Sequence, residues 1–107
     1  MDSRIEEHAR ILVEWSTEVK RNDMVVIRAS PESHDLAVAV AKKASEKGAK
    51  VMTVFQSEEL DRAIFDGADD ETLQKMSEHY KAAAEKADVF IDLSAPMNTK
   101  ALANVPD

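Results

Sequence analysis

The stretch "MVVIRA", residues 24–29, decides the fold class of this chain, because apolar side chains occupy consecutive positions instead of alternating with polar ones. A strand with this pattern is covered on both faces, which is typical of a central strand in a parallel sheet. Asn22-Asp23 precede the strand and Ser30-Pro31 follow it. The serine suits a helix N-cap and the proline suits a first helical position. The stretch therefore predicts a buried strand that leads directly into a helix.

The segments on either side continue this alternation of strands and helices. Helical spacing and capping residues predict helices over residues 3–21, from Pro31 to a cap at Gly48, over residues 58–66, and from Asp69 or Asp70 through Met76 to Ala87. Two further strands are predicted over residues 50–55 and 89–93, and a short helix over 98–103. We expect the large aromatic side chains of Trp15 and Phe55 to lie in the core.

The order of these segments indicates an α/β fold, with a three-layer, doubly wound parallel sheet of three strands and flanking helices. Crossovers between parallel strands are almost always right-handed, and the first strand is the most buried one. We therefore place the first strand in the centre, in the order second–first–third. By its length, the chain is expected to form a single domain over residues 1–107.

The composition argues against several classes of partner. The formal net charge is −7, and the pI is about 4.9. A phosphate backbone or an anionic lipid surface requires a basic face, so we expect neither nucleic acid nor a membrane as partner. The charged start "MDSRIEEHAR" lacks the layout of a signal peptide, and there is no cysteine for disulfides. An intracellular location is consistent with these features.

The residues after the first strand form the candidate ligand site, because the switch point of a doubly wound sheet is its usual ligand crevice. The candidate substrate-cleft or anion contacts are Arg28, Ser30, Ser33 and His34. The free amides of a helix N-terminus would suit an anion or a carboxylate there. The plainer interpretation is that Ser30 caps the helix and the other side chains are solvated. With only two glycines in the chain, neither a dinucleotide fingerprint nor a P-loop is present.

No catalytic residue and no metal ligand is assigned in this chain. The histidines, His8, His34 and His79, fall on three different predicted helices and belong to no metal-binding motif. The acidic pairs Glu58-Glu59 and Asp69-Asp70 open helices, where carboxylates favour the positive end of the helix dipole.

The stretch "FIDLSAP" offers an alternative, because it is similar to the phosphoacceptor strand of bacterial receiver domains. Asp92 would be the acceptor in such a free-standing, flavodoxin-like signalling or binding module. Receivers, however, begin with a strand that ends in an acidic pair for Mg²⁺, whereas here the first strand ends in Arg28-Ala29-Ser30. A positive charge thus stands where the metal should bind, and a long helix precedes the strand. We do not favour this alternative.

The whole chain has a more specific resemblance. The segment "DMVVIRASPESHDLAVAVAKKASEKGAKVMTVFQSEEL", followed by a helical stretch and "ADVFIDLSAPMNTKALANVPD", resembles the N-terminal domain of the thermophilic-type metallo-aminopeptidases. This family includes aminopeptidase T, aminopeptidase S and related leucyl aminopeptidases. The similarity extends from about Ile5 to Asp107. One departure is the loop "SAPMN", where the family tends to carry Gly and Asp-Pro; whether this loop contacts substrate here is left open.

The resemblance implies that the chain is the N-terminal domain of a longer, two-domain, cytoplasmic and dimeric enzyme that removes N-terminal amino acids from peptides. It implies two divalent metal ions (Co, Zn, Mn or Mg) in the C-terminal domain of that parent, where metals activate a water and polarise the scissile carbonyl. The N-terminal domain would help to wall the substrate cavity and support dimer assembly. The implied partners are its own C-terminal domain, a second copy of the parent and the peptide substrate, and this chain alone should be inactive.

Overall fold

A computed structural model describes residues 2–75 and 78–94 of the chain. In chain order the elements are α1 (Ser3–Ile11), a π-helical turn (Leu12–Ser16), β1 (Met24–Ala29), a 3-10 turn (Pro31–Ser33), α2 (His34–Glu46), β2 (Lys50–Phe55), α3 (Glu58–Gly67), α4 (Asp70–Lys75), α5 (Glu78–Lys86) and β3 (Val89–Asp92). The short helix expected over residues 98–103, and Met76 within the predicted long helix, lie outside the described residues.

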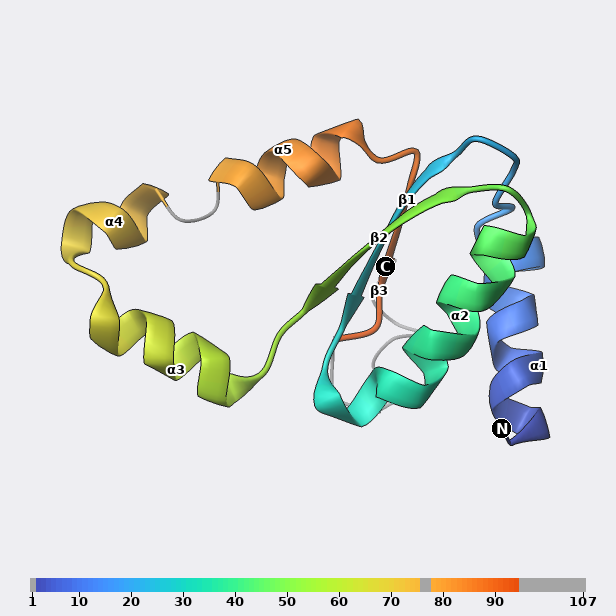
Figure 1. The fold of residues 1–107 in the computed structure, drawn as a ribbon, viewed down its shortest axis with the longest axis horizontal. Helices are drawn as coiled ribbons and strands as arrows, with labels where there is room; N and C mark the ends of the chain where they lie inside the picture. The colour runs from blue at the N-terminus through green and yellow to red at the C-terminus, as the bar shows by residue number, and fades with distance from the viewer. Residues whose placement is uncertain (1, 76–77, 95–107) are drawn as a thin grey trace.

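The sheet confirms the predicted fold class and strand order. Within the described part of the chain, three strands form one sheet in the order β2-β1-β3, and both pairings are parallel. The chain runs from β1 to β2 at one edge of the sheet and then crosses to β3 on the other side of β1. With right-handed crossovers, this reversal places the two connections on opposite faces. Figure 1 shows this arrangement, with α1 and α2 on one side of the sheet and α3, α4 and α5 on the other.

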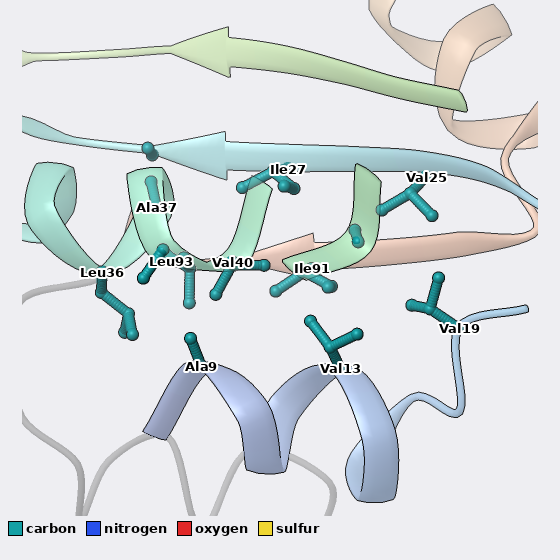
Figure 2. Packing of buried hydrophobic residues seen from close by; sticks show 13 residues of the cluster. Ala9, Val13, Val19, Val25, Ile27, Leu36, Ala37, Val40, Ile91 and Leu93 are labelled. Atoms are coloured by element: carbon teal, nitrogen blue, oxygen red, sulfur yellow. The ribbon is translucent and has the colours of Figure 1, made fainter. Parts of the chain in front are cut away.

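The hydrophobic core lies between the sheet and the two helices α1 and α2 (Figure 2). Val13, Ile27 and Val40 are among its fully buried side chains, and they come from the π-helical turn, β1 and α2. Burying one such side chain contributes about 1.5–3 kcal/mol of transfer free energy. The other face of β1 is covered as well, because Val26, whose side chain points to that face, is buried. The pattern that predicted a central strand is therefore explained by burial on both faces.

The first helix ends earlier than predicted, at Ser16 instead of residue 21. Its last turn is π-helical, with the Thr17 backbone N–H donating to the Leu12 carbonyl oxygen at 3.1 Å. Backbone dihedral φ is positive at Glu18 (49°) and Asn22 (71°), which is incompatible with a continuing right-handed helix. Val19, which follows the end of the helix, is nevertheless buried.

The prediction that Trp15 and Phe55 belong to the core is wrong. The Trp15 side chain is 71% exposed and that of Phe55 is 51% exposed. Trp15 lies in the π-helical turn, whose wider winding moves later residues off the apolar stripe expected for a regular helix. Phe55 is the last residue of β2, and β2 has only one neighbouring strand in the described sheet.

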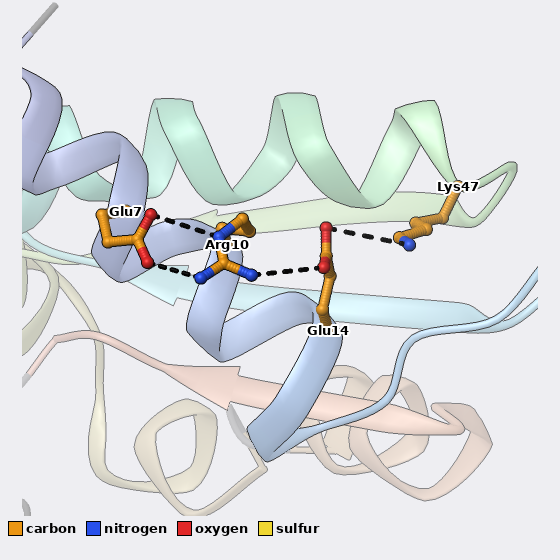
Figure 3. Close-up of polar contacts among 4 residues, drawn as sticks. All are labelled: Glu7, Arg10, Glu14 and Lys47. Atoms are coloured by element: carbon orange, nitrogen blue, oxygen red, sulfur yellow. Dashed lines mark hydrogen bonds and ion pairs between the residues drawn. The ribbon is translucent and has the colours of Figure 1, made fainter.

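An ion-pair network links α1 and the π-helical turn to the end of α2 (Figure 3). Arg10 donates to the Glu7 carboxylate and lies 3.5 Å from Glu14, whose other oxygen lies 3.9 Å from the Lys47 ammonium. The hydrogen bond from Arg10 holds the pKa of Glu7 below its ordinary value. These side chains are between 37% and 55% exposed, so water and salt screen the network and its contribution to stability is small.

The two glycines provide a matched test of the backbone. Gly48 has φ of +89°, and a Cβ there would lie 2.9 Å from Cγ of Arg21; Gly67 ends α3 and has no atom within 4 Å of such a Cβ. We expect Gly48→Ala to lower the free energy of unfolding by about 1–2 kcal/mol. Gly67→Ala should raise it by about 0.5 kcal/mol, because alanine favours the helix. Urea unfolding followed by circular dichroism measures both, and a stabilising Gly48→Ala would contradict the left-handed cap.

Candidate functional site

A cleft of about 750 Å³ opens at the carboxyl ends of β1 and β2, where the strand order reverses. This is the place where open α/β sheets usually bind ligands. The residues lining the cleft are Arg28, Ser30, Pro31, Glu32, Gln56, Ser57, Glu58, Glu59, Asp61 and Ser94. They come from the end of β1 and its following turn, from the connection between β2 and α3 together with the first turn of α3, and from the segment after β3.

The structure brings together only part of the predicted site. Arg28 and Ser30 line the cleft, whereas Ser33 and His34 are not among its lining residues. The Ser33 side chain is buried, accepts a hydrogen bond from the Ser30 backbone N–H at 3.0 Å and donates one to the Ser30 carbonyl oxygen at 3.2 Å. The His34 side chain is 65% exposed and lies 3.9 Å from Asp35. The capping box of Ser30 and Ser33 supports Ser30 as the helix cap, whereas the burial of Ser33 contradicts its expected solvation. Substrate contact by Arg28 and Ser30 stays a prediction.

Arg28 is held in position by the opposite layer of the fold. Its Nη1 donates to the Tyr80 hydroxyl at 3.3 Å and lies 3.7 Å from the Asp92 carboxylate. The guanidinium carbon lies 5.5 Å from the centre of the Tyr80 ring, a cation–π arrangement. Tyr80 in turn meets Phe90 edge to face, with ring centres 6.0 Å apart. Contacts from α5 and β3 therefore fix a side chain that β1 delivers to the cleft.

The lining of the cleft is more acidic than the predicted site. One guanidinium, that of Arg28, faces four carboxylates from Glu32, Glu58, Glu59 and Asp61. The acidic residues follow β2 directly, and Ser57 positions them by capping α3, its hydroxyl accepting from the Leu60 backbone N–H at 3.1 Å. Sequence reasoning missed them as site residues, although the carboxyl end of β2 adjoins that of β1 in the predicted strand order.

The described residues do not fit a two-metal centre. Within residues 2–75 and 78–94, no three histidine, aspartate or glutamate side chains are placed to hold one metal ion. His8, His34 and His79 lie on α1, α2 and α5. Asp69 caps α4, accepting from the Thr72 backbone N–H at 2.7 Å, and hydrogen bonds with Thr72 lower its pKa below the ordinary value. The Asp69 carboxylate thus has a structural partner in the helix it opens.

Asp92, the phosphoacceptor in the receiver-domain alternative, already has hydrogen-bond and ion-pair partners within the chain. Its Oδ1 accepts hydrogen bonds from the Ser94 backbone N–H at 2.9 Å and from the Ser94 hydroxyl at 2.6 Å. Its Oδ2 lies 3.7 Å from the Arg28 guanidinium. A phosphoacceptor aspartate requires a bound Mg²⁺ beside it, and here a cation of the protein stands in that place.

We therefore expect no phosphorylation of Asp92. Incubation with acetyl phosphate and Mg²⁺, followed by mass spectrometry of the intact chain, should leave its mass unchanged. An Asp92→Asn variant treated in the same way is the control for modification at other residues. Stoichiometric phosphorylation that the Asp92→Asn change abolishes would contradict this prediction and favour the receiver alternative.

The comparisons with known proteins identify the family. The sequence model of the thermophilic metalloprotease (M29) family matches residues 1–107. The chain belongs to this family. Among solved structures, wild-type AmpT from Thermus thermophilus matches with a TM-score of 0.68 and 22% identity, over 95% of this chain and 27% of that one. The M29 chain described here therefore shares the fold of about a quarter of AmpT. No curated protein sequence matches it.

Within residues 2–75 and 78–94 of this M29 chain, no helix is long and apolar enough to cross a bilayer.

Proposed function

We propose that this chain is the N-terminal domain of a larger metal-dependent aminopeptidase, which removes N-terminal amino acids from peptides in the cytoplasm. The observation that carries the proposal is the match of the thermophilic metalloprotease family model to all of residues 1–107. The length comparison supports a domain of a larger enzyme, because the similar part makes up only 27% of the AmpT chain.

The role proposed for this domain is to wall the substrate cavity, while catalysis takes place in the C-terminal domain of the parent. The cleft beside Arg28 and Ser30 supports this role, because it is a concave surface at the usual ligand position of the fold and most of its lining residues are polar or charged. The two divalent metals (Co, Zn, Mn or Mg) are proposed for the C-terminal domain. The donor set in the described part of the chain does not fit them, so no catalytic step is assigned to these residues.

The partners proposed are the C-terminal domain of the same parent and, in the assembled enzyme, a second copy of it. Exposed apolar side chains on α3 support an interface: Leu60, Ile64 and Phe65 are 45%, 42% and 68% exposed. They repeat at helical spacing on one helix that extends away from the sheet (Figure 1). An apolar stripe of this kind usually marks a surface that another body covers.

The test is an aminopeptidase assay of the full-length parent with a leucyl anilide. We expect release of the N-terminal residue that a chelator abolishes and that Co²⁺, Zn²⁺ or Mn²⁺ restores, because a bound metal is required for the chemistry. A peptide with a blocked N-terminus is the matched control and should not be cleaved. Activity that persists after complete metal removal, or a metal-loaded parent without activity, would overturn the proposal.

A further inference from the structure

The outer edge of β2 is open in the part of the chain that the structure describes. Among the described strands only β1 adjoins β2, and the side chains of Met52, Thr53 and Phe55 are exposed. The segment 51–55, "VMTVF", contains no charged residue, proline or glycine. Free edges of native sheets usually carry such residues, because an unprotected edge strand pairs with another chain. This edge is therefore a candidate contact surface.

The hydrogen bonds of β2 indicate which backbone groups face this edge. The Lys50 N–H donates to the Asp23 carbonyl oxygen at 2.8 Å and so points toward β1. The Gln56 N–H does the same, because it donates to the Ala29 carbonyl oxygen at 2.9 Å. Successive residues of a strand direct their backbone groups to opposite sides. The N–H and C=O groups of residues 51, 53 and 55 therefore point to the open edge.

An antiparallel second copy of β2 matches these outward groups. With Thr53 on a two-fold axis, Val51 of one copy lies opposite Phe55 of the other, and Thr53 lies opposite its own equivalent. Each of these pairs joins residues with outward backbone groups, so each pair exchanges N–H···O=C hydrogen bonds. Their side chains share one face, where Thr–Thr and aromatic–β-branched pairs are favourable. On the other face, Met52 lies opposite Val54.

The charges that flank β2 favour the antiparallel orientation. Exposed lysines, Lys47 and Lys50, lie at its amino end. Acidic side chains follow its carboxyl end, in the first turn of α3: Glu58, Glu59 and Asp61. In an antiparallel pair the basic end of each strand lies beside the acidic end of the other, and the two ends attract each other. A parallel copy in register would place like charges side by side.

We propose that two copies of this chain pair through the outer edges of β2, antiparallel about a two-fold axis at Thr53, and form one continuous sheet. A two-fold contact uses the same edge of both copies, so association ends at the dimer. A strand pair buries less than the roughly 1,200 Å² of a standard interface, so the dimer should be reversible, with a dissociation constant of about 10–100 µM.

This pairing deepens the proposed function, which names a second copy of the parent as a partner. It rests on the backbone and flanking charges of β2, and it is a property of the 107-residue chain itself. The outcomes below therefore do not depend on the aminopeptidase assay of the parent, and either proposal can fail while the other holds.

Single introduced cysteines test which residues meet, because the chain has no cysteine of its own. In the proposed pair the two Thr53 Cα atoms lie about 5.5 Å apart, a distance that a disulfide spans. The two Lys50 Cα atoms lie about 20 Å apart, since each is displaced along its strand in opposite directions from the axis. Under mild oxidation we expect Thr53→Cys to form a disulfide-linked dimer and Lys50→Cys to remain monomeric. Equal cross-linking of the two variants, or none of Thr53→Cys, would overturn the proposal.

Sedimentation equilibrium of the unmodified chain measures the association itself. The average mass should rise toward that of a dimer, and no further, between about 5 µM and about 500 µM. Thr53→Lys should abolish this rise, because it places two like charges directly opposite each other. Gln74→Lys adds the same charge at an exposed position of α4 and should leave the association unchanged. A mass that stays monomeric, growth beyond the dimer, or equal loss in both variants would contradict the pairing.

Discussion

The 107-residue chain by itself is expected to hydrolyse no leucyl anilide, even with Co²⁺, Zn²⁺ or Mn²⁺ in excess. Two-metal hydrolysis needs carboxylate or imidazole ligands around metals about 3.5–4 Å apart. In the described part of the chain no three such side chains converge, and the histidines lie on separate helices. Enzymes accelerate reactions by about 10⁶-fold or more, so the isolated chain should show only the background rate of the metal solution.

The absence of activity is informative only if the isolated chain is folded under the assay conditions. Circular dichroism and a cooperative urea transition provide that control, and the full-length parent at the same concentration provides the positive one. Hydrolysis by the folded 107-residue chain that a chelator abolishes would contradict the assignment of catalysis to the C-terminal domain. Such a result would leave the family membership intact and would relocate the metal site.

Val40→Asp is expected to remove about 4 kcal/mol or more of the free energy of unfolding. Val40 is fully buried in the middle of α2, and Figure 2 shows its side chain in the core between the sheet and α1. A carboxylate there loses its hydration and finds no compensating charge among the core side chains, which are apolar. A domain of this size has a total stability of about 5–15 kcal/mol, so the change should nearly unfold it.

The matched control for this change is Val38→Asp in the same helix. Val38 is 44% exposed, so its carboxylate remains in water. Valine and aspartate have similar helix propensities, and the expected change is therefore within about 0.5 kcal/mol. If the Val40→Asp chain is too unstable to measure, Val40→Ala against Val38→Ala gives the same comparison, with an expected loss of about 2 kcal/mol at Val40 alone. Equal losses at the two positions in urea unfolding would contradict the described core.

The local features of this fold could be predicted because each depends on neighbours in the chain. The run of apolar residues 24–27 placed β1 at the centre of a parallel sheet, and the strand order followed from chain handedness. Gly48 adopts the left-handed conformation predicted for the cap after α2. Capping and backbone handedness involve atoms only a few residues apart, so composition and spacing suffice to predict them.

The exposure of the aromatic residues and the composition of the cleft were decided by tertiary structure. Helical spacing assumed a regular turn at Trp15, whereas the π-helical turn and the early helix end depend on how residues 12–22 pack and reverse. The cleft joins Arg28, from β1, with Gln56 and the acidic residues of α3. These residues come directly after β2 and lie almost thirty residues beyond Arg28 in the chain. Capping by Ser30 could be predicted from sequence, whereas the burial of Ser33 and the placement of Arg28 and Gln56 on one face of the sheet depend on tertiary packing and strand register. Such a juxtaposition depends on pairing between distant strands, and no local sequence period encodes it.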